Sequence, residues 1–176
     1  MKDRITLRSM VLPVTLAVFC VQLPASWAAP PVLNAQGQLM VDGNRFFPVG
    51  MFEVAIPEIH SLPTESFNVV ADPSWAQGPQ NTPAYLKVAR ESGLRMIAGL
   101  PSEMVRAKDA RFIESYVRAV KDDDRLLVWY TFEEPSGSHV TVEQGEFAFQ
   151  AIHKQDPTRP ILFVDFQAQN ITAYKN

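Results

Sequence analysis

The chain has 176 residues, which suits one domain, and 47% of them are hydrophobic, 20% charged and 10% aromatic. This composition is typical of a globular protein with a real core and excludes repeat and low-complexity proteins. The net charge is −3 and no basic stripe runs along the chain, so we expect neither nucleic acid nor an anionic membrane surface as a partner.

Residues 1–28 have the organisation of a secretory signal peptide. A basic head precedes an uncharged, mostly apolar run over residues 10–21, and small residues stand at Ser26 and Ala28, the two positions that a signal peptidase reads. This pattern predicts cleavage near Ala28 and a periplasmic or secreted mature protein. The run is shorter than the roughly 18 residues that suggest a membrane span, so an uncleaved anchor is the weaker alternative.

Cys20 is the only cysteine of the chain, and it lies inside this signal. Phe19 precedes it, whereas a lipoprotein signal needs a small residue there, so we expect no lipid anchor. The mature chain would have no thiol and could form no disulfide, although export would permit one. This favours an exported bacterial protein over a small secreted eukaryotic module.

Short strands follow the signal. Residues 32–41 resemble a strand interrupted by Gly37, and Asp42-Gly43 predicts a tight hairpin turn. The later apolar runs are nearly continuous rather than alternating, which is typical of strands buried on both faces of a parallel sheet. The strands predicted for this sheet are 46–52, 67–71, 95–100, 126–132 and 161–166.

A first long helix is predicted between the second and third of these strands. Thr82 is its expected cap, Pro83 suits the first helical position, and Gly93 is expected to end it. The earlier connector, residues 55–66, contains two prolines and leaves room only for a stub of helix.

Two more helices are predicted further along the chain. Residues 107–121 place apolar side chains along one helical face. Residues 141–155 begin with Thr141 and Gln144 at the spacing of a capping box, and an Asp-Pro pair follows their end. Strands that alternate with helices in this way indicate a parallel α/β fold.

Two architectures of this class compete, a doubly wound open sheet and a (β/α)₈ barrel. No glycine-rich phosphate loop follows the first strand, which counts against a nucleotide-binding open sheet and gives no reason to expect a cofactor. In both architectures the functional groups gather at the carboxyl ends of the strands, so the residues at the strand exits are the candidates for a site.

Acidic residues stand at every predicted strand exit, and two exits add an aromatic residue. The three histidines have no spacing that suits a metal, and no Gly-x-Ser-x-Gly motif is present. Acids beside aromatic rings, without a metal or nucleotide signature, suit a carbohydrate, because sugars offer hydroxyls to carboxylates and C–H faces to rings. The residues at these exits are Glu53, Asp72 with Trp75, Glu103, Glu133 with Glu134, and Asp165.

The order of five segments resembles the clan A glycoside hydrolases, which include β-galactosidase, β-mannanase and cellulase-like barrels. The resemblance implies a (β/α)₈ barrel in which strand four ends in Asn-Glu-Pro or Asp-Glu-Pro, with the glutamate as acid/base. Glu134 occupies that position here, and Glu133 takes the place of the residue that contacts the sugar. Glu53, Asp72, Trp75 and Asp165 would also bind the carbohydrate substrate. The matching segments are 37–53, 67–70, 93–101, 129–135 and 156–160.

This sequence departs from the family pattern in two ways. Glu133 replaces the usual Asn or Asp, and two neighbouring carboxylates raise the pKa of one of them. The family's nucleophile is a glutamate on strand seven, whereas this chain stops soon after its fifth strand and is shorter than the roughly 250 residues of a whole barrel. We therefore expect a partial barrel that lacks its nucleophile, is inactive alone and self-associates through exposed sheet edges.

The predicted organisation is a signal peptide at 1–28, a hairpin segment at 29–45 and a truncated glycoside-hydrolase-like barrel at 46–176. The alternative function is a non-catalytic carbohydrate-binding or vestigial protein. Each candidate residue also has a purely structural interpretation: a solvated helix start for Glu133 and Glu134, a core position for Trp75, an ion pair for Glu53, and helix caps for Asp72 and Asp165.

Overall fold

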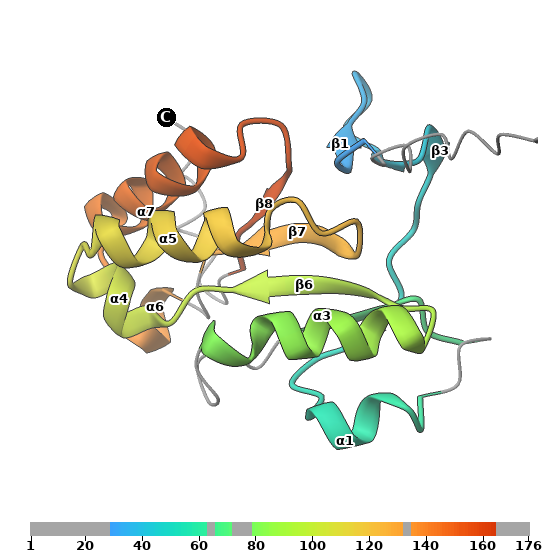
Figure 1. The fold of residues 1–176 in the computed structure, drawn as a ribbon. Coiled ribbons are helices and arrows are strands. Elements are labelled where there is room, and N and C mark those ends of the chain that lie inside the picture. Colours follow the sequence, from blue (N-terminus) through green and yellow to red (C-terminus); the bar gives the residue numbers. More distant parts are fainter. Residues whose placement is uncertain (1–28, 63–65, 72–78, 132–134, 165–176) are drawn as a thin grey trace, which may run out of the picture.

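The structure is a computed structural model that describes residues 29–62, 66–71, 79–131 and 135–164. It has a five-stranded parallel sheet in the sequential order β4-β5-β6-β7-β8 and a three-stranded antiparallel sheet in the order β1-β2-β3 (Figure 1). The strands are β1 Val32–Leu33, β2 Leu39–Val41, β3 Asn44–Arg45, β4 Gly50–Met51, β5 Val69–Ala71, β6 Arg95–Gly99, β7 Leu126–Tyr130 and β8 Ile161–Leu162.

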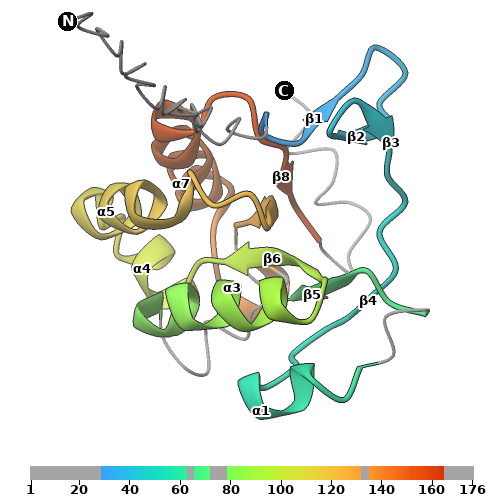
Figure 2. The same cartoon turned by 45° about the vertical axis from the view of Figure 1, so that its right-hand side comes forward.

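The sequential strand order confirms the predicted α/β fold, with five parallel strands preceded by an antiparallel hairpin segment. This is the order that the first five strands of a (β/α)₈ barrel have. Figures 1 and 2 show the hairpin strands standing apart from the helices that pack on the parallel sheet. Within the described part of the chain, no helix combines the length and apolar character needed to cross a membrane.

The predicted strand over residues 46–52 is wrong as a single element. Within that range only β4, Gly50–Met51, is a strand of the parallel sheet, and the hairpin sheet ends just before it with β3 at Arg45. Pro48 lacks an amide proton between them. The side chain of Asn68 takes over the missing ladder bonds, since it accepts from the Val49 amide at 2.8 Å and donates to the Phe47 carbonyl at 3.0 Å.

The turn between β2 and β3 confirms the predicted hairpin. Asp42 and Gly43 both have positive φ, at 50° and 77°, as the central pair of a type I′ turn requires. Close packing explains another glycine, Gly50, because a Cβ there would lie 2.6 Å from the carbonyl oxygen of Val69. The parallel pairing of β4 with β5 therefore depends on the missing side chain.

The helices lie in the predicted intervals, and two details differ. Thr82 is not the cap of its helix: Asn81 holds that position, and the Thr82 hydroxyl instead bonds the Tyr116 hydroxyl at 2.9 Å. The helix predicted over residues 107–121 is α5, which begins at Ala110 because the Asp109 side chain caps it by accepting from the Phe112 amide at 3.0 Å; the short helix α4, which precedes it, was not predicted. The helices are α1 Ile56–Ile59, α3 Thr82–Glu91, α4 Ser102–Arg106, α5 Ala110–Val120, α6 Pro135–Ser138 and α7 Val142–Gln155, with a 3₁₀ turn at Pro79–Asn81.

Two helix ends follow the sequence closely. Thr141 accepts from the Gln144 amide, and the Gln144 side chain accepts from the Thr141 amide at 2.9 Å, so the predicted capping box forms at the start of α7. Gly93 follows α3 with φ of 72°, the left-handed conformation that commonly ends helices.

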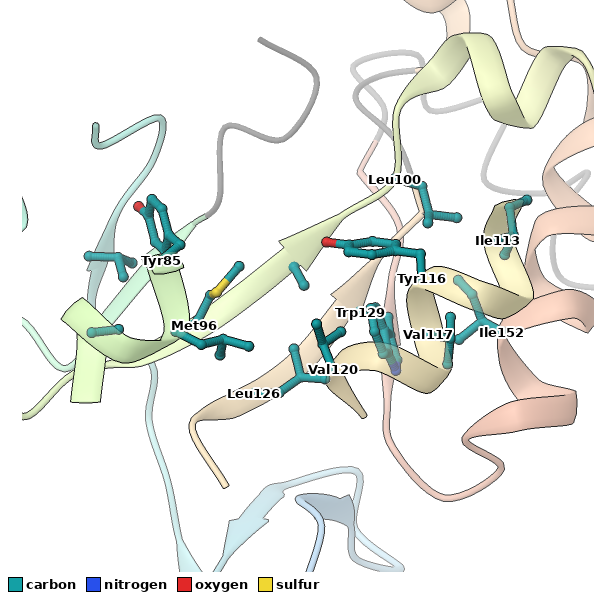
Figure 3. Packing of buried hydrophobic residues seen from close by; sticks show 14 of the residues in the cluster. Tyr85, Met96, Leu100, Ile113, Tyr116, Val117, Val120, Leu126, Trp129 and Ile152 are labelled. Carbon is teal, nitrogen blue, oxygen red and sulfur yellow. The ribbon is translucent and has the colours of Figure 1, made fainter. Parts of the chain in front are cut away.

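The main hydrophobic core lies between the parallel sheet and its helices. Trp129 of β7 is fully buried and packs edge-to-face against Tyr116 of α5, with ring centroids 5.9 Å apart (Figure 3). A second, smaller cluster lies on the other face of the sheet, where Val41 of the hairpin packs with Val69 and Leu127. The hairpin therefore covers part of the face opposite the one on which the described helices pack.

Candidate functional site

One of the six predicted site residues, Glu53, lies in the described part of the chain. Five predicted site residues lie outside the described residues: Asp72, Trp75, Glu133, Glu134 and Asp165. The described strands that lead to them end at Ala71 in β5 and Tyr130 in β7. Because the strands are parallel, their carboxyl ends form one edge of the sheet, which we call the carboxyl edge.

An aromatic contact shows that the sheet is concave at this edge. The rings of Phe52, just after β4, and Tyr130, in β7, have centroids 6.1 Å apart at 76°. Two strands lie between β4 and β7, so a flat sheet would separate their backbones by about 14 Å. The rings meet because the sheet curls toward the face that packs against the hairpin. Gly99 of β6, which pairs with Tyr130, has no side chain to keep the rings apart.

Phe52 remains accessible at this concave edge, although its partner is buried. Phe52 is 48% exposed, and Tyr130 is 4% exposed. Tyr130 must point away from the helices because its neighbour Trp129 points toward α5. The sequence placed Phe52 at a strand exit but gave no sign that Tyr130, in an apolar run, would support it.

Glu53 stands next to Phe52 in an unusual backbone conformation. Its φ is 55°, the left-handed region that side-chain-bearing residues rarely occupy, and its side chain is exposed. No described cation lies within ion-pair distance of its carboxylate, so the structural ion-pair interpretation gains no support. Strained residues of this kind concentrate at functional sites.

Tyr85 of α3 holds the backbone beneath this edge. Its hydroxyl lies 2.7 Å from the carbonyl oxygen of Val54 and 3.0 Å from that of Ala71, and the residue is 1% exposed. One hydroxyl thus joins the residue after Glu53 to the last residue of β5. The sequence predicted the helix that contains Tyr85, but the hydroxyl's partners could not be found without the tertiary structure.

Polar contacts also anchor the chain that follows the β7 exit. Arg106 of α4 donates to the carbonyl of Ser138 in α6 at 2.7 Å, and Gln144 donates to the carbonyl of Arg106 at 2.8 Å. Lys108 bonds the Glu143 carboxylate, and that hydrogen bond lowers the pKa of Glu143. Helix α4, which follows β6, therefore fixes the position of α6 and of the start of α7.

The described residues contain no group of three or more His, Cys, Asp or Glu side chains that could hold a metal ion. His139 and His153 are exposed, and His60 bonds the Ser92 hydroxyl at 3.1 Å on the surface. Glu103, the acid at the exit of β6, is exposed in the first turn of α4.

A surface pocket opens at the opposite edge of the sheet, where the strands begin. It lies between the Pro30-Pro31 segment and the loop from Asp156 to Arg159. Its charged groups are paired with one another: Arg90 bonds Asp123 at 2.9 Å, and the other pairs include Arg159 with Asp156 at 2.7 Å. This pocket is lined by charged groups that form ion pairs with one another, and it lies away from the carboxyl edge.

Comparison with known proteins supports the fold. No protein-family model matches this sequence, and no curated protein sequence matches it. Among solved structures, the chain is similar to a crystal structure from Bacteroides vulgatus described as a "putative glycoside hydrolase", with a TM-score of 0.59 and 11% sequence identity. The match covers 79% of this chain and 39% of that chain, so this chain spans well under half of its neighbour's length. What the two chains share is the fold.

Proposed function

We propose that this protein is an exported glycoside-hydrolase-like protein that binds a carbohydrate at the carboxyl edge of its sheet. The observation that carries the proposal is the concave edge itself, where the exposed Phe52 ring lies next to the exposed Glu53 carboxylate. Asp72, Trp75, Glu133 and Asp165 would complete the sugar contacts. The fold shared with the Bacteroides vulgatus protein agrees with this assignment.

Glu134 is the proposed proton donor. In glycoside hydrolysis a protonated carboxyl gives its proton to the glycosidic oxygen as the bond to the anomeric carbon breaks. A retaining enzyme also needs a carboxylate nucleophile about 5–5.5 Å from the acid, on the opposite face of the sugar. We propose that this chain corresponds to the first part of a retaining barrel, and that the nucleophile belongs to the later strands of such a barrel.

The second candidate function is carbohydrate binding without catalysis. The described part of the edge favours it, because Phe52 and Glu53 can hold a sugar without performing any bond cleavage. The two functions share a ligand and differ in turnover, so one set of measurements separates them.

The test uses the full chain, produced with its own leader in a bacterium and purified from the periplasm. Binding of β-linked oligosaccharides is measured by calorimetry, and turnover is measured on aryl β-glycosides. Binding without turnover supports the binding protein, and turnover lost in Glu134→Gln but kept in Glu146→Gln, an exposed acid on α7, supports the enzyme. A chain that neither binds nor cleaves any member of the panel contradicts both.

The same preparation tests export. Mass spectrometry of the purified protein should show an N-terminus at Ala29, because the predicted cleavage follows Ala28. Finding the chain only in the cytoplasm with Met1 intact would contradict the proposal.

Self-association is the further part of the proposal. Strands β4 and β8 form the two edges of the described sheet, and Met51, Leu162 and Val164 are exposed along them. Such edges favour pairing with other chains. Light scattering should therefore show a mass above that of one chain, and a monomer at micromolar concentration would contradict this.

A further inference from the structure

We infer that Phe52, supported by Tyr130, is a stacking platform for a β-linked pyranose ring whose hydroxyls reach the Glu53 carboxylate. This inference rests on the proposed function and names the ligand class of the same edge. It assigns ligand contact to Phe52 and a supporting role to Tyr130, in addition to the acids and the tryptophan at the strand exits.

The first step is the geometry of the ring. Phe52 packs edge-to-face with Tyr130, at 6.1 Å and 76°, so its orientation is set by a partner that is itself 4% exposed. A ring that is both exposed and fixed in orientation loses little conformational freedom when a ligand stacks on it.

The second step is the position of the carboxylate. In a regular strand Phe52 and Glu53 would point to opposite faces. The φ of 55° at Glu53 ends the extended conformation there, so this alternation does not hold at Glu53, and the residue is exposed directly after Phe52 in the chain. Val54, which is buried and bonded to the Tyr85 hydroxyl at 2.7 Å, holds this turn in place.

The third step is the chemistry of the ligand. A pyranose with equatorial substituents offers a flat C–H face to an aromatic ring and directs its hydroxyls outward, where a carboxylate can accept from them. β-Linked gluco-configured rings offer the flattest face of this kind. A quaternary ammonium ion is the other ligand that combines an aromatic face with a carboxylate, and it provides a discriminating probe.

The test measures affinity of the purified full chain by calorimetry. The probes are β-1,4-linked glucose oligosaccharides, the α-linked tetramer of glucose and tetramethylammonium. We expect the β-linked probe to bind best, Phe52→Ala to weaken it about tenfold, and Phe52→Tyr to stay within about threefold of the wild type. Phe52→Leu, which keeps apolar volume without an aromatic face, should weaken binding about as much as Phe52→Ala.

Phe149 provides the matched control. It is 41% exposed and stacks on His153 at 5.5 Å on α7, away from the carboxyl edge. Phe149→Ala should leave the affinity unchanged, and thermal melting should show that each variant is folded.

The outcomes separate this inference from the proposed function. Sugar binding that survives Phe52→Leu and Phe52→Ala overturns the platform and leaves the proposed function standing. Equal losses in Phe149→Ala, or tighter binding of tetramethylammonium than of any sugar, also overturn it. A wild-type chain that binds no sugar overturns the proposed function together with the platform.

Discussion

The two edges of the parallel sheet differ in the burial and pairing of their side chains. At the edge where strands begin, a buried arginine and a buried aspartate are paired, and the hairpin sheet packs on the adjoining face. At the carboxyl edge, Phe52 and Glu53 are exposed and Glu53 has a strained backbone. The first edge places its polar groups where they stabilise the fold, and the second exposes an aromatic ring and a carboxylate. In (β/α)₈ barrels the two ends of the strands divide stability and function in the same way.

The polar groups at the edge where the strands begin form hydrogen bonds with one another and with nearby backbone carbonyls. Arg159, 5% exposed, bonds the Asp156 carboxylate at 2.7 Å and the carbonyls of Lys121 and Leu126. The same Asp156 oxygen accepts from the Trp129 indole at 2.9 Å. The segment 156–160 that resembles a glycoside-hydrolase motif therefore acts here as a structural clamp beneath β7 and β8.

The largest expected effect comes from breaking this clamp. Arg159→Met should lower the free energy of unfolding by about 3–5 kcal/mol, because it leaves the buried Asp156 carboxylate without its counter-ion. Urea denaturation measures the loss. Arg118→Met, at an exposed pair with Glu114, is the matched control and should cost at most about 0.5 kcal/mol. Equal losses in the free energy of unfolding for the two variants would contradict the expected difference between a buried and a surface ion pair.

A smaller loss is expected beneath the carboxyl edge. Tyr85→Phe keeps the ring but removes the hydroxyl between the carbonyls of Val54 and Ala71, which should cost about 1–3 kcal/mol. It should also weaken sugar binding, because Val54 no longer holds the Glu53 turn. Denaturation and calorimetry on the same sample measure both effects. Unchanged affinity would show that Tyr85 has only a structural role.

Substitutions at Glu53 should change sugar affinity and leave stability almost unchanged, whereas Arg159→Met mainly changes stability. Glu53→Gly removes the strain of a left-handed residue, which offsets the larger entropy of glycine in the unfolded chain, so stability should change by less than about 0.5 kcal/mol. Sugar affinity should nevertheless fall about tenfold, since a charged hydrogen-bond acceptor is lost. Glu53→Gln is the control that keeps the strain and removes the charge. A Glu53→Gly variant with normal affinity would contradict the proposed role.

The smallest effect is expected from a surface carboxylate at neither edge. The hydrogen bond from Lys154 lowers the pKa of Glu114 in the folded state. The resulting stabilisation is therefore present above the unfolded pKa of about 4.3 and disappears as the pH falls through the lower, folded pKa. Glu114→Gln should melt slightly below the wild type at pH 7 and together with it at pH 2. A difference in melting temperature that grows as the pH falls would contradict the expected direction of this pH dependence.

Short-range signals in the sequence determined much of the fold. The capping box at Thr141 and Gln144, the Asp42-Gly43 turn and the left-handed Gly93 each act over a few residues, so their roles follow from local chemistry. The uninterrupted apolar runs likewise predicted five parallel strands, because burial on both faces requires them. The predicted strand order placed Glu53 at a strand exit, and the structure has it two residues after β4.

Tertiary structure alone decided the features that join distant residues. The side chain of Asn68 divides the strand predicted over residues 46–52, and the Tyr116 hydroxyl takes Thr82 away from its expected capping role. The contact between Phe52 and Tyr130 exists only because the sheet curls. Neither local propensity nor periodicity encodes such partners, since the residues meet only after the strands and helices have packed.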